Sequence, residues 1–236
     1  NLGGAREGAR ISNALSFQSQ THSLLGSDLV GWWNFDDLNA PLKDLSGSGN
    51  DGRWKGSGDP VPLDKLKDGI PGTRGRAVEL TDVGEYIEAL SVLPEDDFTL
   101  SLWVKRTSGD INNRYVFDTP NHSFYLINYG NYIALRGSGM SSSDIYRDDL
   151  INNWLHIVIS KNDSIVRFII NTEEVSQRNS SNLSYQTTLM MGVRYNFGDT
   201  ILGGLLDDVR IYSRTLTARE VQTLYTQSRE RHFSED

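Results

Sequence analysis

The chain has 236 residues and a formal net charge of −8, from 31 Asp and Glu against 23 Lys and Arg. This charge argues against nucleic acid and anionic membranes as partners. The absence of cysteine excludes disulfides, thiol chemistry and cysteine zinc sites. No apolar run approaches the ~18 residues of a membrane-spanning helix, and the length suits one large domain.

Residues 1–27 differ from the rest, because Ala and Leu alternate with Arg, Glu and Gln in a weakly amphipathic helical pattern. One interpretation is a helix packed outside the domain, or a flexible leader. The other rests on Asn1–Arg10, which resembles the second half of the long N-terminal helix of type IV pilins and pseudopilins. That resemblance implies self-assembly into filaments, with membrane contact only through a missing apolar segment. Since the chain begins at Asn1, we expect a processed or trimmed piece.

Short β segments begin at Leu29 and define a second region, residues 28–236. Leu29–Phe35 alternates as a first strand, with Trp33 and Phe35 on one face, and a Gly-rich loop follows over Asp44–Gly52. The composition of residues 57–73 predicts a long surface loop.

Stronger strand patterns follow in the middle of the chain. Gly75–Leu80 and Glu85–Leu90 are predicted to form one hairpin, and Trp154–Ser160 and Ile165–Ile170 another. Phe98–Lys105 alternates most clearly, and its apolar face comprises Phe98, Leu100, Leu102 and Val104. Many short strands at regular spacing predict two packed antiparallel sheets.

The final strand lies within Gly203–Tyr212. Alternation places Leu205, Val209 and Ile211 on its core face, together with the acidic Asp207, whose burial requires a partner. Thr217–Glu220 then forms a capping-box pattern, and Val221, Leu224 and Tyr225 give one apolar stripe of a short closing helix.

The motif from Asp207 to Thr217, the Trp33-x-Phe35-Asp36 opening and the Phe98–Lys105 strand resemble laminin-G-like domains of the concanavalin A-like lectin/glucanase superfamily. The resemblance covers roughly Leu29 to Gln227. It implies an all-β fold, a two-sheet antiparallel jelly-roll sandwich, here with an N-terminal helix and a short C-terminal helix.

Oxygen-bearing side chains are expected to meet where the first strand ends and the last begins. The predicted ligands are Asp36, Asp37, Asn50 and Asp207. An oxygen-only set is typical of Ca²⁺. The resemblance implies a structural ion that pins the N-terminal loop to the last strand. The alternative is that these acids cap turns and face water.

Aromatic and hydrogen-bonding side chains around a predicted strand pair suggest a glycan-binding face. The cluster comprises Tyr129, Asn131, Tyr132 and Arg136, with Tyr125 nearby and a second group at Tyr195–Phe197. Sugar rings stack on aromatic rings, and their hydroxyls pair with amide and guanidinium groups. The alternative is that these tyrosines only pack on an exposed strand.

Signals for catalysis are few. The Glu-x-Asp-x-x-Glu motif of glucanases is missing, Glu85-Tyr86-Ile87-Glu88 lacks its spacing, and the four histidines are scattered. We therefore expect a non-enzymatic adhesion or recognition module, calcium-stabilised, extracellular or on a bacterial cell surface, that binds a glycan or cell-surface ligand. Two alternatives stay open, a carbohydrate-binding module of a secreted enzyme and a divergent glycoside hydrolase.

Overall fold

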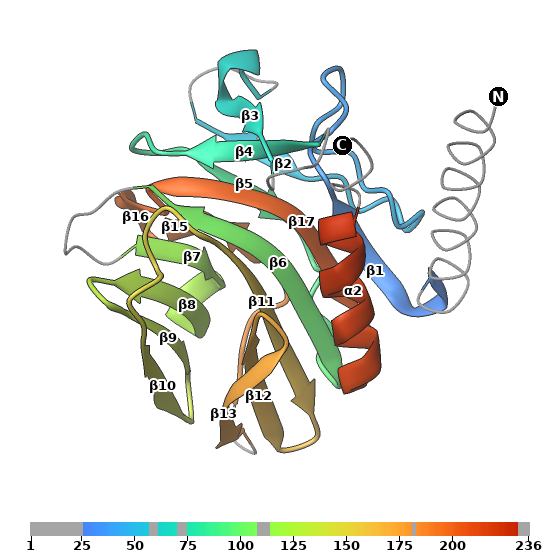
Figure 1. Cartoon of the computed structure of the whole chain (residues 1–236), viewed down its shortest axis with the longest axis vertical. Helices are drawn as coiled ribbons and strands as arrows, with labels where there is room; N and C mark the ends of the chain where they lie inside the picture. Colours follow the sequence, from blue (N-terminus) through green and yellow to red (C-terminus); the bar gives the residue numbers. More distant parts are fainter. Residues whose placement is uncertain (1–25, 57–60, 70–74, 108–113, 181–182, 231–236) are drawn as a thin grey trace, which may run out of the picture.

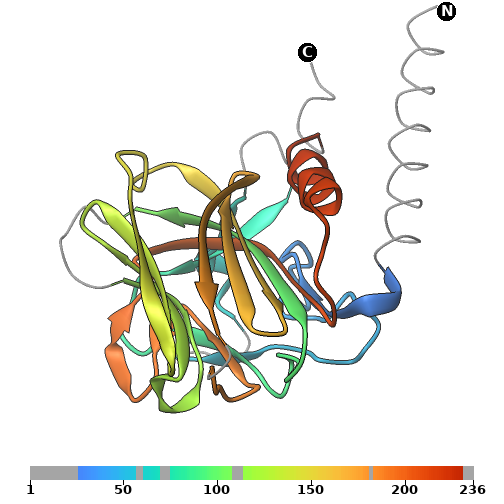
Figure 2. The same cartoon turned by 90° about the horizontal axis from the view of Figure 1, so that it is seen from below.

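The protein is described here from a computed structural model, which covers residues 26–56, 61–69, 75–107, 114–180 and 183–230 (Figure 1). The predicted N-terminal helix, and with it the pilin-like stem, lies almost wholly outside these residues. Within them the chain forms the predicted sandwich of two antiparallel sheets, closed by one helix (Figures 1 and 2).

The first sheet has eight strands and carries the closing helix. Its order is β13 (Glu173–Asn179), β12 (Ile165–Ile170), β11 (Trp154–Asn162), β6 (Phe98–Arg106), β17 (Gly204–Tyr212), β4 (Arg76–Leu80) and β3 (Leu66–Asp68), and β1 (Leu29–Trp33) also pairs with β17. Of the 3₁₀ turns in the described residues, η1 (Gly26–Asp28) precedes β1, whereas η2 (Leu63–Lys65) and η3 (Pro120–His122) lie between strands.

The second sheet has seven strands and faces the first across the core. Its order is β10 (Met140–Tyr146), β9 (Tyr132–Gly137), β8 (Phe124–Tyr129), β7 (Arg114–Asp118), β14 (Leu189–Met191), β5 (Tyr86–Ala89) and β2 (Arg53–Lys55). A separate two-stranded ribbon joins β15 (Val193–Arg194) to β16 (Phe197–Ile201).

The inward faces of the two sheets form one core. The predicted face of β6 is confirmed, because Phe98, Leu100, Leu102 and Val104 are all buried in that core. Trp33 and Phe35 are buried there as well, as predicted. The predicted pairing of β11 with β12 is also confirmed.

The face assigned to the start of β17 is wrong. Asp208 has a φ of 46°, and the register against β6 shifts between Asp207 and Arg210, so a β-bulge interrupts the alternation. As a result Leu206, rather than Leu205, joins Val209 and Ile211 in the core.

The bulge coincides with a change of partner along one edge of β17. Residues before it pair with β4, from Gly204 to Leu206, whereas residues after it pair with β1, from Val209 to Tyr212. The last residue of β17 that pairs with β4 is Leu206 and the first that pairs with β1 is Val209, so the two aspartates lie between the two partners.

The closing helix, α2 (Ala218–Glu230), begins with the predicted capping box. The Glu220 amide donates to Thr217 Oγ1 at 3.3 Å, and the Thr217 amide donates to Glu220 Oε2 at 2.7 Å. Val221 and Leu224 are buried, and Tyr225 stacks on Trp103 of β6 with ring centroids 5.5 Å apart. The predicted stripe therefore packs on the outer face of the eight-stranded sheet. Among the described residues, no helix combines the length and the apolar character needed to cross a membrane.

Two local predictions fail. The segments predicted as a hairpin are β4 and β5, which belong to different sheets, since β4 pairs with β3 and β17 whereas β5 pairs with β2 and β14. The described part of the predicted loop at 57–73 contains η2 and β3. Short strands with few apolar residues, such as β3, give too little alternation to be predicted.

Candidate functional site

A groove of about 590 Å³ opens at one end of the seven-stranded sheet. It lies between η3, the start of β8, the end of β9, the start of β10 and residues 184–186. Its lining residues are Asn121, His122, Ser123, Tyr125, Arg136, Gly137, Ser138, Met140, Ser142, Ser184, Tyr185 and Gln186. The volume is that of an ordinary small-ligand site, and the lining offers hydroxyl, amide, imidazole and guanidinium groups.

A stacked pair of rings forms one wall of the groove. The His122 and Tyr125 rings lie with centroids 3.6 Å apart and planes inclined by 20°. Tyr125 in turn stacks on Tyr115 of β7, with centroids 5.7 Å apart. The pair is thus a preformed, half-buried aromatic surface beside polar groups.

A buried carboxylate orients His122. Asp118 is fully buried at the end of β7, and its Oδ2 lies 2.7 Å from His122 Nδ1 and accepts a 2.9 Å hydrogen bond from the Tyr195 amide. The other ring nitrogen, Nε2, lies 3.5 Å from the Tyr115 hydroxyl. Burial raises the pKa of Tyr115 to about 12, so this hydroxyl keeps its proton at neutral pH.

The backbone around His122 is also unusual. Asn121 and His122 have φ values of 63° and 55°, in the left-handed region that residues with side chains rarely adopt. Two such residues in succession turn the imidazole back onto Tyr125. Backbone strain of this kind is concentrated at functional sites.

Arg136 supplies the guanidinium of the groove. It faces Tyr125 across the β8–β9 ladder. Its Nη2 donates to Asp144 Oδ1 at 3.3 Å and its Nε donates to Ser142 Oγ at 3.2 Å, both on β10. Arg136 is therefore held over the sheet by the neighbouring strand and lines the groove with a planar set of donors.

The predicted ligand-binding residues fall at two places on one strand pair. Arg136 lies in the groove, whereas Tyr129 and Tyr132 flank the two-residue turn at the other end of the pair, which contains Asn131. In the second predicted group, the Tyr195 amide donates to Asp118, and the side chain of Phe197 lies outside the described residues. A role for His122 was not predicted from the sequence analysis. The sequence feature that could have indicated one is the spacing of four residues between Asp118 and His122.

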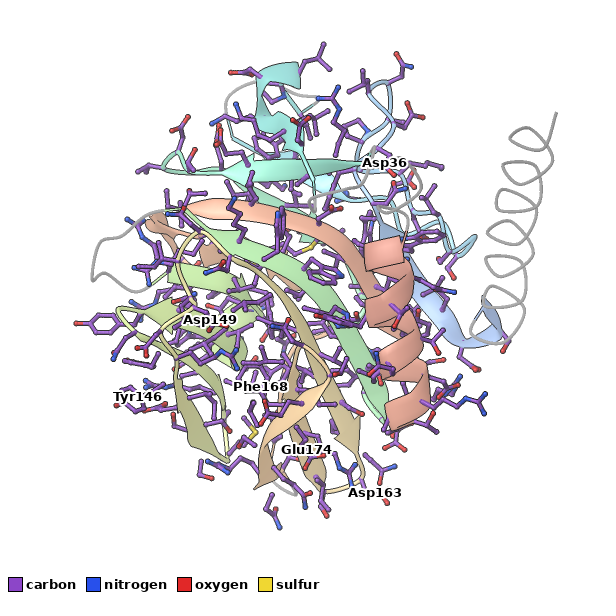
Figure 3. The ribbon with its side chains drawn as sticks, viewed as in Figure 1. Asp36, Tyr146, Asp149, Asp163, Phe168 and Glu174 are labelled. Carbon is purple, nitrogen blue, oxygen red and sulfur yellow. The ribbon has the colours of Figure 1, made fainter. Side chains whose placement is uncertain are left out.

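The predicted metal ligands also separate. Asp36 and Asp207 both reach the segment next to β3 and β4, because Arg76 N donates to Asp36 Oδ1 at 2.7 Å. A Cβ built on Gly69 would lie 2.6 Å from Asp207 Oδ2, so the chain passes against that carboxylate. Asp36 lies far from Tyr146, at the end of β10, in Figure 3.

The other two predicted ligands serve the loops in which they lie. Asp37 Oδ1 accepts a 2.9 Å hydrogen bond from the Asn39 amide, and Asn50 Nδ2 donates to the Val30 carbonyl at 2.8 Å. The buried Asp44 organises the Gly-rich loop by accepting from Trp32 N and Asn50 N. In the described part of the chain, no three His, Cys, Asp or Glu side chains group closely enough to hold a metal. Calcium stays a prediction, with Asp36 and Asp207 as the pair that meets at one segment.

Comparison with known proteins agrees with this architecture. Residues 78–222, more than half of the chain, match the family model described as the concanavalin A-like lectin/glucanases superfamily. The protein belongs to this superfamily. Nothing among the curated proteins matches the sequence.

Similar folds occur in solved structures of bacterial binding domains. One is the ligand binding domain of botulinum neurotoxin serotype D in complex with N-acetylneuraminic acid, with a TM-score of 0.66, 16% identity, and coverage of 87% of this chain and 52% of that chain. Another is domain 4 of AbnA, an extracellular arabinanase from Geobacillus stearothermophilus, in complex with arabinotriose, with a TM-score of 0.65, 20% identity, and coverage of 84% and 98%. The protein thus spans about half the length of the neurotoxin domains, and at these identities the likeness shows the lectin-like fold.

Proposed function

We propose that this protein is a non-catalytic glycan-binding module and that the groove beside η3 is its binding site. The observation that carries the proposal is the stacked His122–Tyr125 pair next to Arg136. Sugar rings present apolar faces and rings of hydroxyl groups, and this site offers an aromatic surface with fixed hydrogen-bonding groups around it.

The chemistry of the lining supports binding rather than hydrolysis. Glycoside hydrolases place two carboxyl groups on either side of the scissile bond. The residues that line this groove carry hydroxyl, amide, imidazole and guanidinium groups. Asp118, behind His122, is fully buried and engaged by three hydrogen bonds, so it orients the imidazole instead of facing a ligand.

Such a module could belong to an extracellular carbohydrate-active protein or recognise glycans on a cell surface, and the similar structures support both roles. The arabinanase domain is nearly the same size as the aligned region, which favours a carbohydrate-binding module of an extracellular protein. The neurotoxin domains favour recognition of a cell-surface glycan. We propose an extracellular or cell-surface location, with adhesion as the role. The calcium proposed at Asp36 and Asp207 would supply charge neutralisation between β1 and β17.

The test is a glycan array followed by affinity measurement of matched variants. Arg136→Met removes the guanidinium from the groove, and Arg167→Met removes one from the opposite sheet. The two arginines are matched, because each has a side chain 34% exposed and each forms an ion pair with an acid on the neighbouring strand. Exposed pairs contribute about 0–1 kcal/mol to stability, so both variants should fold.

We expect Arg136→Met and Tyr125→Ala to weaken glycan binding at least about tenfold and Arg167→Met to leave it unchanged. Retention of no glycan on a broad array would contradict the proposal. If the parent protein and Arg136→Met bound the glycan with equal affinity, the binding site would lie outside this groove. Loss of binding in Tyr125→Ala counts only if its circular dichroism spectrum matches that of the parent protein.

A further inference from the structure

A second aromatic surface lies at the far end of the same strand pair. Tyr129 of β8 and Tyr132 of β9 lie with ring centroids 5.3 Å apart, and Tyr132 lies 5.5 Å from Tyr146 of β10. We call these three residues the tyrosine strip. Tyr146 is labelled near the β9–β10 margin of the molecule in Figure 3.

Packing of the core does not account for Tyr146. Tyr146 is 69% exposed, which makes it one of the most exposed large hydrophobic residues in the described part of the chain. Its ring lies beside the ring of Tyr132. Three neighbouring aromatic rings, two half-buried and one largely exposed, give a surface that suits stacking with a ligand.

The tyrosine strip and the groove lie on the same face of the seven-stranded sheet. Tyr125, from the groove, and Tyr132, from the strip, both pack against a small outer cluster of Tyr115, Ile127 and Ala134. That shared cluster lies under both surfaces, so the groove and the tyrosine strip belong to one continuous face of the sheet.

The spacing sets the size of such a ligand. Tyr125 and Tyr129 are four residues apart on β8, and a strand rises about 3.4 Å per residue, so their Cα atoms are separated by roughly 14 Å. One sugar ring cannot contact both, whereas a chain of several rings can. The strands are antiparallel neighbours, so the same span separates Arg136 from Tyr132 on β9.

We infer that the groove and the tyrosine strip are two subsites of one extended site, and that the ligand class is a linear oligosaccharide or polysaccharide lying along β8 and β9. The groove holds one part of the chain through His122, Tyr125 and Arg136. The strip stacks on sugar rings further along. This inference rests on the proposed glycan-binding function and specifies its substrate class.

Linking two subsites through one ligand raises affinity without new chemistry at either subsite. The second contact becomes intramolecular once the first is made, so affinity increases steeply when the chain is long enough to reach both subsites. A chain too short to reach the strip gains nothing from it. Affinity as a function of chain length is therefore the diagnostic property.

The experiment is isothermal titration calorimetry with arabino-, xylo- and cello-oligosaccharides, each from the disaccharide to the octasaccharide. The variants are Tyr146→Ala, Tyr129→Ala and the control Val83→Ala, which removes an equally exposed side chain (71%) from the turn before β5. Because Tyr146 is so exposed, its replacement should leave folding unaffected.

We expect the affinity of the parent protein for one series to rise at least about tenfold between short and long chains. Tyr146→Ala and Tyr129→Ala should abolish that rise while leaving the affinity for the shortest bound chain unchanged, and Val83→Ala should behave like the parent protein. Equal affinity for short and long chains, with no effect of Tyr146→Ala, would overturn the extended site but leave the groove intact. No binding by any oligosaccharide of any length would overturn the proposed function as well.

Discussion

The Trp32 indole donates a 2.8 Å hydrogen bond to Asp208, from the first strand of the domain to the last. The same carboxylate accepts a 2.7 Å hydrogen bond from Ser228 Oγ of α2 and forms an ion pair with Arg210 Nη2 at 2.9 Å. The Arg210 guanidinium in turn lies over the Trp32 ring, 4.7 Å from its centroid. One buried acid therefore joins β1, β17 and the closing helix.

Replacing this carboxylate should destabilise the domain strongly. Asp208→Asn keeps the shape and tolerates the positive φ, but it leaves Arg210, whose side chain is only 8% exposed, without this counter-charge. Removing one partner of a buried pair costs about 3–5 kcal/mol, so we expect a loss near 3 kcal/mol in urea unfolding. Asp163→Asn is the matched control, because Asp163 is exposed and has a φ of 47°. It should stay within about 0.5 kcal/mol, and equal stability of both variants would refute this role for Asp208.

Stability should also depend on His156, which is fully buried beneath α2. Burial lowers the pKa of His156 to about 3, although the charge of Asp208 acts in the opposite direction. An unfolded chain protonates this ring near pH 6.5, so unfolding takes up a proton at any pH between these values. Stability is then fully present above about pH 6.5 and declines by about 1.4 kcal/mol per pH unit toward pH 3. Urea unfolding of the parent protein and of His156→Gln should show a shallower decline in the variant, and an NMR titration of His156 near pH 6.5 would contradict the account.

The start of α2 should contribute a second, more acidic pH dependence. A hydrogen bond from Arg214 lowers the pKa of Glu220 to about 2, and hydrogen bonds from Thr217 act in the same direction. Because the folded-state pKa is the lower one, this stabilisation is present above about pH 4.5 and is lost as the pH falls toward 2. Glu220→Gln should cost about 1 kcal/mol at pH 7 and nothing near pH 2. A constant difference between the two proteins at both pH values would argue against this origin.

Calcium can be tested with two neighbouring acids. If Asp36 and Asp207 hold the predicted ion, chelator should lower the melting temperature of the protein and calcium should restore it, since a ligand at a hundredfold excess over its Kd stabilises by about 2.7 kcal/mol. Asp36→Ala should remove the response to calcium, and Asp37→Ala, which alters only a turn, should keep it. Identical melting curves in chelator and in millimolar calcium would exclude the ion.

Sequence patterns predicted the central elements of the fold because their signals are local. Alternation over Phe98–Lys105 and the capping box at Thr217 each depend on residues close in the chain, and both are confirmed. The bulge at Asp208 could not be predicted in this way. It accompanies the change of partner from β4 to β1, and the residues next to it in the sequence carry no pattern that predicts a bulge. Likewise β4 and β5 alternate like a hairpin, and only their partners across the sandwich separate them.

The candidate site divides in the same way. Tyr125 and Arg136 were found because aromatic and guanidinium groups stood close together in the sequence, on strands that do pair. His122 was missed because an isolated histidine carries little information, and its role depends on Asp118 and on two consecutive left-handed residues. The groove is also lined by residues 184–186, which lie some sixty positions after His122 in the sequence. Only the folded chain brings these residues next to His122 and Tyr125.

The most direct test of glycan binding in the groove is an NMR titration of the ¹⁵N-labelled protein with the best-bound oligosaccharide. We expect the largest amide shift changes at His122, Tyr125 and Arg136, and further changes at Tyr132 and Tyr146 only with longer chains. The backbone around α2 and around Asp36 should remain unshifted at saturation. Shift changes centred on α2 or on the Asp36–Arg76 contact, with none in the groove, would contradict the account.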